Sequence, residues 1–195
     1  MEPPAALTLG KQDVMNSGSK LLFISASAGK VSRCEMLVDV ISTMLGGHYT
    51  QMGHVRVREL PAGALLSSQI GDVEIARALQ LVEDAQAIVI VTPVYKGSYS
   101  GLLKAFLDIL PQYGMRGKYI LPFAVGGSLA HMQMLDYSLR PVLQTMWPAH
   151  IGQGSFVLDQ HILQDKNMPS LADGTLSIVR DAIEGFTHLL DKQLG

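Results

Sequence analysis

The sequence predicts an α/β protein in which helices cover both faces of a parallel sheet. Apolar runs rich in β-branched residues, such as residues 87–91 (Ala-Ile-Val-Ile-Val), are typical of strands buried on both sides. These runs alternate with longer segments whose apolar residues recur with the period of a helix. Parallel neighbours need a crossover connection, and right-handed crossovers place helices on both faces. We therefore expect a doubly wound, three-layer sandwich.

Five strands and five helices alternate along the chain. The predicted strands cover residues 21–25, 53–58, 87–92, 119–125 and 151–158, the last being the weakest, and the predicted helices cover residues 32–45, 71–85, 101–110, 129–146 and 171–193. Residues 159–169 are polar and end in Asn-Met-Pro, which predicts a long surface excursion. Residues 1–19 mix Pro, Gly and polar residues without a period. We expect them to form a disordered or loosely attached arm before a folded domain at residues 20–195.

Length, charge and cysteine content narrow the classes of function. With 195 residues, 48% of them hydrophobic, the chain can bury a substantial core as one domain. A formal net charge of −2 provides no basic field, so neither nucleic acid nor a membrane is an expected partner. The chain has no apolar stretch of roughly 20 residues and no signal-peptide pattern, which predicts a cytoplasmic protein. One cysteine and six scattered histidines predict neither a disulfide framework nor a metal site.

The first loop that can carry chemistry is residues 25–34 (SASAGKVSRC), after the first predicted strand. Ligands of doubly wound sheets bind beside the carboxyl ends of strands. A helix begins at about Ser32, and its free N–H groups favour an anion whose oxygens Ser27, Ser32 and Arg33 can bond. We therefore expect a phosphate monoester here. The same hydroxyl groups also favour helix caps and turns without any ligand, and this alternative stays open.

More specific sequence motifs, for nucleotide binding or for a catalytic nucleophile, are missing from this region. Neither G-x-x-x-x-G-K-[ST] nor G-x-G-x-x-G follows the first strand. Cys34 stands near a helix N-terminus, where the pKa of a thiol can be lowered. A phosphatase-type nucleophile would need an arginine about one turn further on, and residues 38–42 contain none. We interpret Cys34 as a phosphate-loop or packing residue.

The second loop is residues 92–101 (TPVYKGSYSG), after the third predicted strand. Pro93 stiffens the strand exit, Tyr95 and Tyr99 offer flat faces, and Lys96 offers a cation. Two glycines allow a ligand to approach the backbone closely. This combination suits a planar heterocycle, although two loop tyrosines can equally cover the edge of the sheet.

The third loop is residues 124–128 (AVGGS), after the fourth predicted strand. Backbone N–H groups at Gly126 and Gly127, with the hydroxyl of Ser128, can approach the polar edge of a ligand. An ordinary strand-to-helix turn that needs positive φ explains the two glycines equally well. Three such loops at one edge of a sheet are better evidence for a site than any one alone.

A longer pattern joins these loops. It runs from Thr92-Pro93-Val94-Tyr95-Lys96 through Tyr99-Ser100-Gly101-Leu102-Leu103-Lys104, Leu107-Asp108, Leu110-Pro111, Gly117-Lys118, Gly126-Gly127-Ser128 and Ala130-His131 to residues 136–143 (DYSLRPVL). This pattern resembles the NAD(P)H-dependent FMN reductases over about residues 21–159. Within them it is most similar to the flavin reductase component of two-component alkanesulfonate monooxygenases, and the part around Tyr95 is the most specific.

The resemblance implies a flavodoxin-like fold with a five-stranded parallel sheet in the order 2-1-3-4-5, and FMN as the ligand. It implies that NADPH or NADH passes a hydride directly to the flavin, so no catalytic residue is expected. Reduced FMN would leave for a separate FMNH2-dependent monooxygenase. By position, the FMN phosphate falls on Ser27, Ser32, Arg33 and Cys34, the isoalloxazine ring beside Pro93, Val94, Tyr95, Lys96 and Ser98, and the ring's polar edge on Gly126, Gly127 and Ser128.

The first loop departs from the family pattern. Its usual form is Gly-Ser-x-Arg, whereas residues 26–29 are Ala-Ser-Ala-Gly, so the arginine is missing and Lys30 is an imperfect substitute. Weaker phosphate contacts would suit a protein that exchanges FMN as substrate and product.

The fourth predicted helix contains Pro141, which removes an N–H group and clashes with the carbonyl of Tyr137. We expect a kink or a π-bulge between the two residues. In the sulfonate-linked reductases this region is a π-helical insertion at a tetramer interface near the flavin, which Tyr137 and His131 would share here. A buried tyrosine in an ordinary kinked helix is the alternative.

Two other functions stay open. One is a reductase of quinones, azo compounds or metal ions with tightly held FMN. The other is a flavodoxin-type electron carrier, which a net charge of −2 disfavours because flavodoxins are typically strongly acidic.

Overall fold

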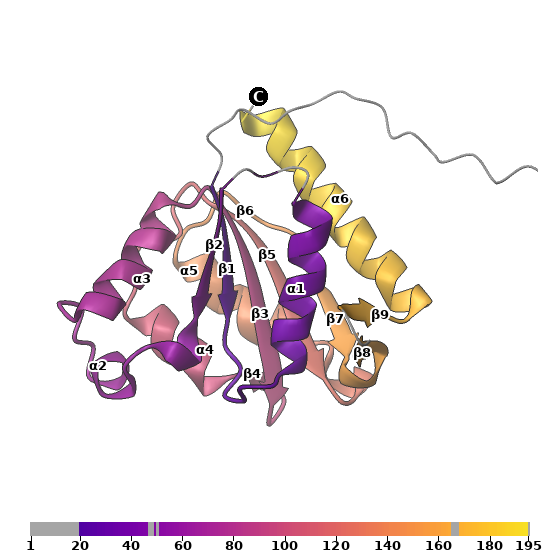
Figure 1. The fold of residues 1–195 in the computed structure, drawn as a ribbon. Helices are drawn as coiled ribbons and strands as arrows, with labels where there is room; N and C mark the ends of the chain where they lie inside the picture. Colours follow the sequence, from indigo (N-terminus) through magenta and orange to yellow (C-terminus); the bar gives the residue numbers. More distant parts are fainter. Residues whose placement is uncertain (1–19, 47–48, 50, 165–167, 195) are drawn as a thin grey trace, which may run out of the picture.

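The computed structural model describes residues 20–46, 49, 51–164 and 168–194. The principal strands of the sheet are β1 (Lys20–Ser25), β2 (Gln51–Arg56), β3 (Ala87–Tyr95) and β5 (Tyr119–Gly126), followed by the short strands β6 (His150–Ile151) and β7 (Ser155–Leu158). They pair in parallel in the order β2-β1-β3-β5-β6, with β7 also beside β5 (Figure 1). The predicted doubly wound sheet and its order are confirmed.

The sheet has seven strands instead of five, for two reasons. The fifth position is split into β6 and β7 by a turn at Gly154, where φ is +68° and a Cβ atom would lie 2.0 Å from the carbonyl oxygen of Pro122. The chain also turns back at the end of β3 to form β4 (Ser98–Tyr99), which is antiparallel to β3. The second strand begins at Gln51 and ends at Arg56, two residues earlier at each end than predicted.

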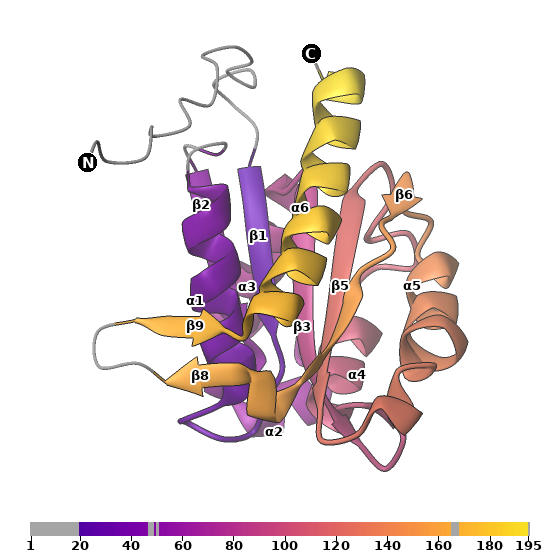
Figure 2. The ribbon, with the colours of Figure 1, turned by 90° about the vertical axis from the view of Figure 1, so that its right-hand side faces the viewer.

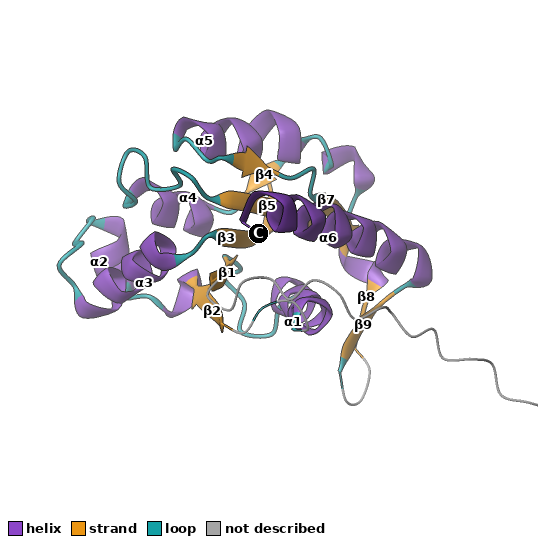
Figure 3. Ribbon diagram, turned by 90° about the horizontal axis from the view of Figure 1, so that it is seen from above, coloured by secondary structure: helices purple, strands orange, loops and turns teal. Residues whose placement is uncertain are grey.

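Helices lie on both faces of the sheet, as Figure 3 shows from above. On one face are α1 (Arg33–Leu45) and α6 (Asp173–Leu194), which lie near each other in Figure 2. The other face is covered by α2 (Ala62–Leu66), α3 (Val73–Asp84), α4 (Gly101–Asp108) and α5 (Arg140–Thr145). The side chains of Ser32, Asp72 and Ser100 cap α1, α3 and α4 by accepting hydrogen bonds from the first turn. The sequence did not predict the short helix α2 or the 3₁₀ turn Val57–Glu59.

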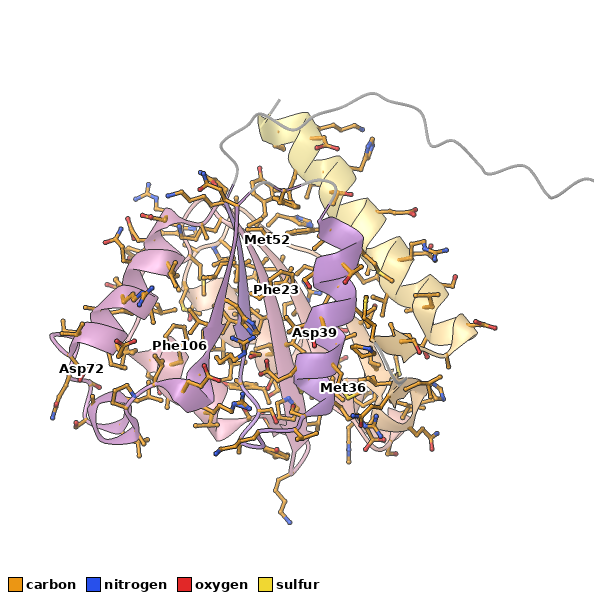
Figure 4. The ribbon with its side chains drawn as sticks, viewed as in Figure 1. Phe23, Met36, Asp39, Met52, Asp72 and Phe106 are labelled. Atoms are coloured by element: carbon orange, nitrogen blue, oxygen red, sulfur yellow. The ribbon has the colours of Figure 1, made fainter. Side chains whose placement is uncertain are left out.

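The alternation of side chains along β1 divides the core in two. Leu22 and Ile24 pack under α3 and α4, whereas Leu21 and Phe23 pack under α1 and α6. Figure 4 labels Phe106 of α4 and Phe23 of β1, one from each cluster. This double burial explains why the central strands are apolar throughout.

The fourth predicted helix is broken, as its proline predicts. A 3₁₀ turn (Leu129–His131) is followed by a π-helix (Leu135–Leu139) and then α5, in which Pro141 lies in the first turn. The N–H group of Arg140 donates to the carbonyl of Leu135, five residues back, as π-helical geometry requires. The predicted irregularity between Tyr137 and Pro141 is confirmed.

The segment at residues 159–169 is more ordered than the predicted excursion. A 3₁₀ turn (Asp159–His161) leads into an antiparallel pair, β8 (Ile162–Gln164) and β9 (Pro169–Leu171). Its tip at residues 165–167 lies outside the described residues. The last helix begins at Asp173 because Leu171 still belongs to β9.

The N-terminal arm predicted for residues 1–19 also lies outside the described residues, so it stays a prediction. Among the helices that the structure describes, none combines the length and the apolar character needed to cross a bilayer.

Candidate functional site

The three predicted loops follow strands that are direct neighbours in the sheet. β3 lies between β1 and β5, with Ser25 beside Val91 and Thr92 beside Ala124. Parallel strands end at the same edge, so the three loops gather there, at the lower end of the sheet in Figure 1. The parts of these loops that lie at the edge are residues 26–32, for which we keep the name first loop, residues 94–99, which we call the hairpin, and residues 126–128, which we call the glycine turn.

Ser100 connects the first loop with the hairpin. Its hydroxyl group donates to the carbonyl of Ala26 at 2.7 Å and accepts from the N–H of Leu103 at 3.1 Å. Its own N–H donates to Thr92 Oγ1 at 3.1 Å, and both Ser100 and Thr92 are buried. One residue therefore caps α4 and sets the spacing between two loops.

The first loop presents the beginning of α1 to the site. Ser27 is only 6% exposed, and Ser32 caps α1 through the N–H of Cys34 at 3.1 Å. Within the described part of the chain, no backbone carbonyl accepts from the N–H groups of residues 27–31. Free N–H groups beside a helix N-terminus are the arrangement that binds phosphate.

Two of the predicted phosphate ligands, Arg33 and Cys34, have other contacts in the structure. Arg33 lies in the first turn of α1, but its guanidinium donates to the carbonyl of Ile162 in β8. Burial raises the pKa of the Cys34 thiol from 9.0 to about 12, so the thiol is neutral at physiological pH. Cys34 is a packing residue whose side chain belongs to the core under α1.

A polar network that the sequence did not reveal lies behind the first loop. Ser25 Oγ donates to Glu35 Oε1 at 2.6 Å and lies 2.9 Å from His54 Nε2, while Arg56 Nε donates to Glu35 Oε2 at 3.1 Å. Burial, followed by the charge of Arg56, lowers the pKa of His54 to about 4. His54 is therefore neutral near pH 7, and Glu35 and Arg56 form the ion pair.

The hairpin has the tightest connection available to two antiparallel strands. Tyr95 pairs with Ser98, and Lys96 and Gly97 between them have φ values of +52° and +76°, as in a type I′ turn. Pro93 is buried, Val94 is half-buried and Tyr95 is 50% exposed. Tyr99, in contrast, packs against the core. Tyr99 therefore covers the sheet, whereas Tyr95 stays half-exposed at the end of β3.

The two glycines of the glycine turn differ in what surrounds them. A Cβ atom at Gly126 would lie 2.8 Å from Phe156 Cζ, so packing against β7 requires this glycine. At Gly127 it would meet only Asp159 Oδ2, at 3.7 Å, so this side is open to a ligand. Ser128 is exposed and its hydroxyl accepts from the N–H of Ala130 at 3.3 Å, as the cap of the following 3₁₀ turn.

The π-helix adjoins the hairpin. The hydroxyl groups of Ser98 and Ser138 are hydrogen-bonded, which joins β4 to the middle of the π-helix. Tyr137 is 80% exposed, and His131 is exposed on the preceding 3₁₀ turn. The alternative of a buried Tyr137 is therefore wrong. Asp108 pairs with Lys104 on the surface of α4.

Sequence reasoning missed three residues behind the site because it considered only the loops after the first, third and fourth strands. Glu35, His54 and Arg58 lie beside the ends of β1 and β2. No motif marks them. Glu35 follows the first loop in α1, whereas only the pairing of β1 with β2 brings His54 and Arg58 to this loop. Ser100 carried a recognisable signal, since a serine before an apolar helical segment is a typical N-cap.

The fold and the three loops define an α/β protein of the flavodoxin-like class with a ligand site at the carboxyl edge of its sheet. The sequence profile of the NADPH-dependent FMN reductases matches residues 19–162. The chain belongs to this family and is an NAD(P)H:FMN oxidoreductase that uses FMN with NADPH or NADH.

Two curated relatives and one solved structure illustrate the similarity. The chain is 36% identical to an FMN reductase (NADPH) of Pseudomonas putida over 71% of each chain. It is 28% identical to an FMN reductase (NADPH) of Escherichia coli over 89% of this chain and 91% of the relative. The crystal structure of an NADH:FMN oxidoreductase in its apo form superposes with a TM-score of 0.79 at 34% identity, covering 91% of this chain and 90% of that one.

Proposed function

We propose that the protein binds FMN across the three loops, reduces it with NADPH or NADH, and releases it to a partner monooxygenase. The observation that carries the proposal is the convergence of these loops at one edge of the sheet. Ser100 bonds Ala26 of the first loop and Thr92 at the end of β3, and β5 supplies the glycine turn beside them.

The phosphate of FMN fits the first loop. The N–H groups of residues 27–31, which have no backbone acceptor among the residues that the structure describes, the hydroxyl group of Ser27 and the N-terminus of α1 are all suited to a dianion. In this proposal Ser32 supports the phosphate site by capping α1, and Cys34 supports it by packing in the core under α1. Arg33 contributes through its place in the first turn of α1.

The isoalloxazine ring fits the surface between the hairpin and the glycine turn. Pro93 and Val94 offer an apolar edge, Tyr95 a half-exposed aromatic face, and Lys96 a cation on a turn with rigid geometry. Ser98, Gly127 and Ser128 offer polar groups, and Gly126 maintains the close packing behind them.

The chain's contribution to the reaction is position and electrostatics. FMN, when bound, accepts a hydride from the nicotinamide at its N5 atom. Direct transfer needs no proton donor or nucleophile from the protein, and the neutral thiol of Cys34 is consistent with this. What the protein must supply is a ring held so that one face stays open to the nicotinamide.

The π-helix supports a role in a two-component system of organosulfur assimilation. A π-helix at Leu135–Leu139 with an exposed Tyr137 is what the resemblance to sulfonate-linked reductases predicts. We infer that Tyr137 and His131 lie at an interface between copies in a homo-oligomer, a dimer or tetramer. We place the reaction in the cytoplasm, where reduced nicotinamides are produced.

Steady-state kinetics with every pair of donor and flavin test the proposal, with NADH and NADPH as donors and FMN, FAD and riboflavin as acceptors. We expect donor oxidation to require added flavin and to be most efficient with FMN. Protein that stays yellow through dialysis and reduces a quinone faster than free FMN would contradict the exchange of flavin. Sedimentation of wild type and Tyr137→Ala, compared with Tyr113→Ala, tests the interface: only Tyr137→Ala is expected to dissociate the oligomer.

A further inference from the structure

The first loop is held from outside by a cation in the turn that follows the neighbouring strand β2. Arg58 lies in the 3₁₀ turn (Val57–Glu59) that follows β2. Its Nη1 atom donates to the carbonyl of Gly29 at 2.8 Å and to the carbonyl of Lys30 at 3.1 Å. Both hydrogen atoms of this nitrogen are therefore used on two consecutive carbonyl groups of the first loop.

Arg58 is itself held in place. Its Nη2 atom donates to Glu59 Oε1 at 3.0 Å, and the Arg58 side chain is only 16% exposed. A guanidinium group has a planar, rigid arrangement of donors, so a pair of carbonyl groups bound to it is fixed in direction as well as in distance. A lysine at this position would offer a point charge without that geometry.

The direction of these carbonyl groups determines where the loop's N–H groups point. In a trans peptide the C=O and the following N–H are antiparallel. When Arg58 draws the carbonyls of Gly29 and Lys30 toward itself, the N–H groups of Lys30 and Val31 point to the opposite side. Those two N–H groups have no backbone acceptor within the part of the chain that the structure describes.

We propose that Arg58 is a positioning residue for the FMN phosphate: it holds the first loop so that the N–H groups of Lys30 and Val31 face the phosphate oxygens. The inference rests on the proposed function, because it requires the first loop to be the phosphate site. Arg58 acts through the loop and keeps its charge beside it, which favours a dianion there.

The test compares FMN with riboflavin, which has the same ring and no phosphate. In Arg58→Gln we expect the dissociation constant of FMN to rise about tenfold and that of riboflavin to change less than about twofold, because two charge-assisted hydrogen bonds that order the loop are lost. Arg58→Lys should be intermediate. The rate at saturating FMN should stay near that of wild type, so the effect appears in KM and not in kcat. Flavin fluorescence quenching measures both constants.

The matched control is Arg77→Gln, which removes one exposed cation from α3 and makes the same change in net charge. It should leave the ratio of the two dissociation constants unchanged. A second variant, Glu59→Gln, keeps Arg58 but removes its charged partner, and should shift the ratio in the same direction by a smaller factor. It allows the same comparison if Arg58→Gln does not fold.

The outcomes separate the two proposals. If wild type binds FMN and riboflavin equally well, the phosphate site itself is wrong, and the role of Arg58 fails with it. If wild type prefers FMN but Arg58→Gln and Glu59→Gln weaken both flavins equally, or neither, the phosphate site stands and the role of Arg58 is overturned.

Discussion

The first loop and the hairpin lie at the ends of neighbouring strands, yet they obtain their shapes in different ways. The first loop is shaped by residues distant in the sequence, since Arg58 and Ser100 hold its carbonyl groups from 28 to 74 positions away. The hairpin is shaped by its own residues, through the pairing of Tyr95 with Ser98 and a two-residue turn. One loop therefore depends on the assembled fold and the other on local backbone geometry.

The difference matters for function because the two loops have different tasks. A phosphate needs several N–H groups pointing at one place, which an unsupported stretch of coil does not maintain without a large entropy cost. A ring needs a flat, stiff surface, which a two-residue hairpin on a central strand provides mainly through its own backbone, with one hydrogen bond between Ser98 and Ser138. Substitutions in each loop and in its supports test this difference.

We expect the largest effect from Ser100→Ala, which removes the support shared by the first loop and α4. The carbonyl of Ala26 and the N–H of Leu103 both lose a buried partner. The free energy of unfolding should fall by about 2–3 kcal/mol, and the KM for FMN should rise. Urea denaturation and kinetics measure both. Thr43→Ala, which removes an exposed hydroxyl group of α1, is the control and should cost less than about 1 kcal/mol; equal losses would contradict the prediction.

The polar network behind the first loop predicts a pH dependence of stability. Burial lowers the pKa of His54 from 6.5 to about 4, so between these values the unfolded chain binds a proton that the folded chain does not. This contribution to the free energy of unfolding is complete above about pH 6.5 and falls by about 3 kcal/mol as the pH drops to 4. Denaturation curves of wild type and His54→Gln at several pH values measure it. The free energy of unfolding of the variant should depend less steeply on pH than that of wild type. Parallel curves would show that His54 is not responsible for the pH dependence.

The hairpin should respond to backbone conformation alone. A Cβ atom at Gly97 would meet nothing within 4 Å, but φ there is +76°. Gly97→Val should therefore destabilise the protein by about 1–2 kcal/mol through strain, without any clash. Gly97→Asn should cost less than about 0.5 kcal/mol, because Asn tolerates this region. Thermal or urea unfolding of the pair checks this, and equal losses would mean that strain is not the cause.

The smallest effect on stability is expected from Lys96→Asn. Asn-Gly is the preferred pair for a type I′ turn, so the free energy of unfolding should rise by no more than about 0.5 kcal/mol. If Lys96 binds the flavin as proposed, the KM for FMN should rise severalfold in the same variant. Stability and affinity would then move in opposite directions. A variant with unchanged KM would remove Lys96 from the proposed site.

Much of the fold was predictable because the physical signals are local. Apolar runs mark β1, β3 and β5, and their burial between two helical layers explains why apolar and polar residues do not alternate along them. Pro141 marked the irregular fourth helix, since a proline within a helical segment removes the backbone hydrogen bond to the residue one turn before it. The split fifth strand was not predicted, because Gly154 shows its role only beside Pro122 of the adjacent strand.

The location of the candidate site could be predicted from the sequence, but the contacts of several of its residues could not. The rule that ligands bind at the carboxyl ends of strands selected three loops that the structure brings together at one edge of the sheet, and the family match supports FMN as the ligand. Arg33 and Gly126 show the limit of the rule. Arg33 reaches the carbonyl of Ile162, and Gly126 makes room for Phe156; both partners lie far along the chain.

By itself, the sequence determined the alternation of strands and helices, the three loops at the strand ends and the break before Pro141. All of these follow from residue types within a few positions of one another. Only the tertiary structure decided which carbonyl groups Arg58 and Ser100 hold, that Cys34 is a neutral packing residue, and that His54 is buried beside Glu35 and Arg56. These features depend on which strands become neighbours, because hydrogen bonds and desolvation act over a few ångströms in space, whatever the distance along the chain.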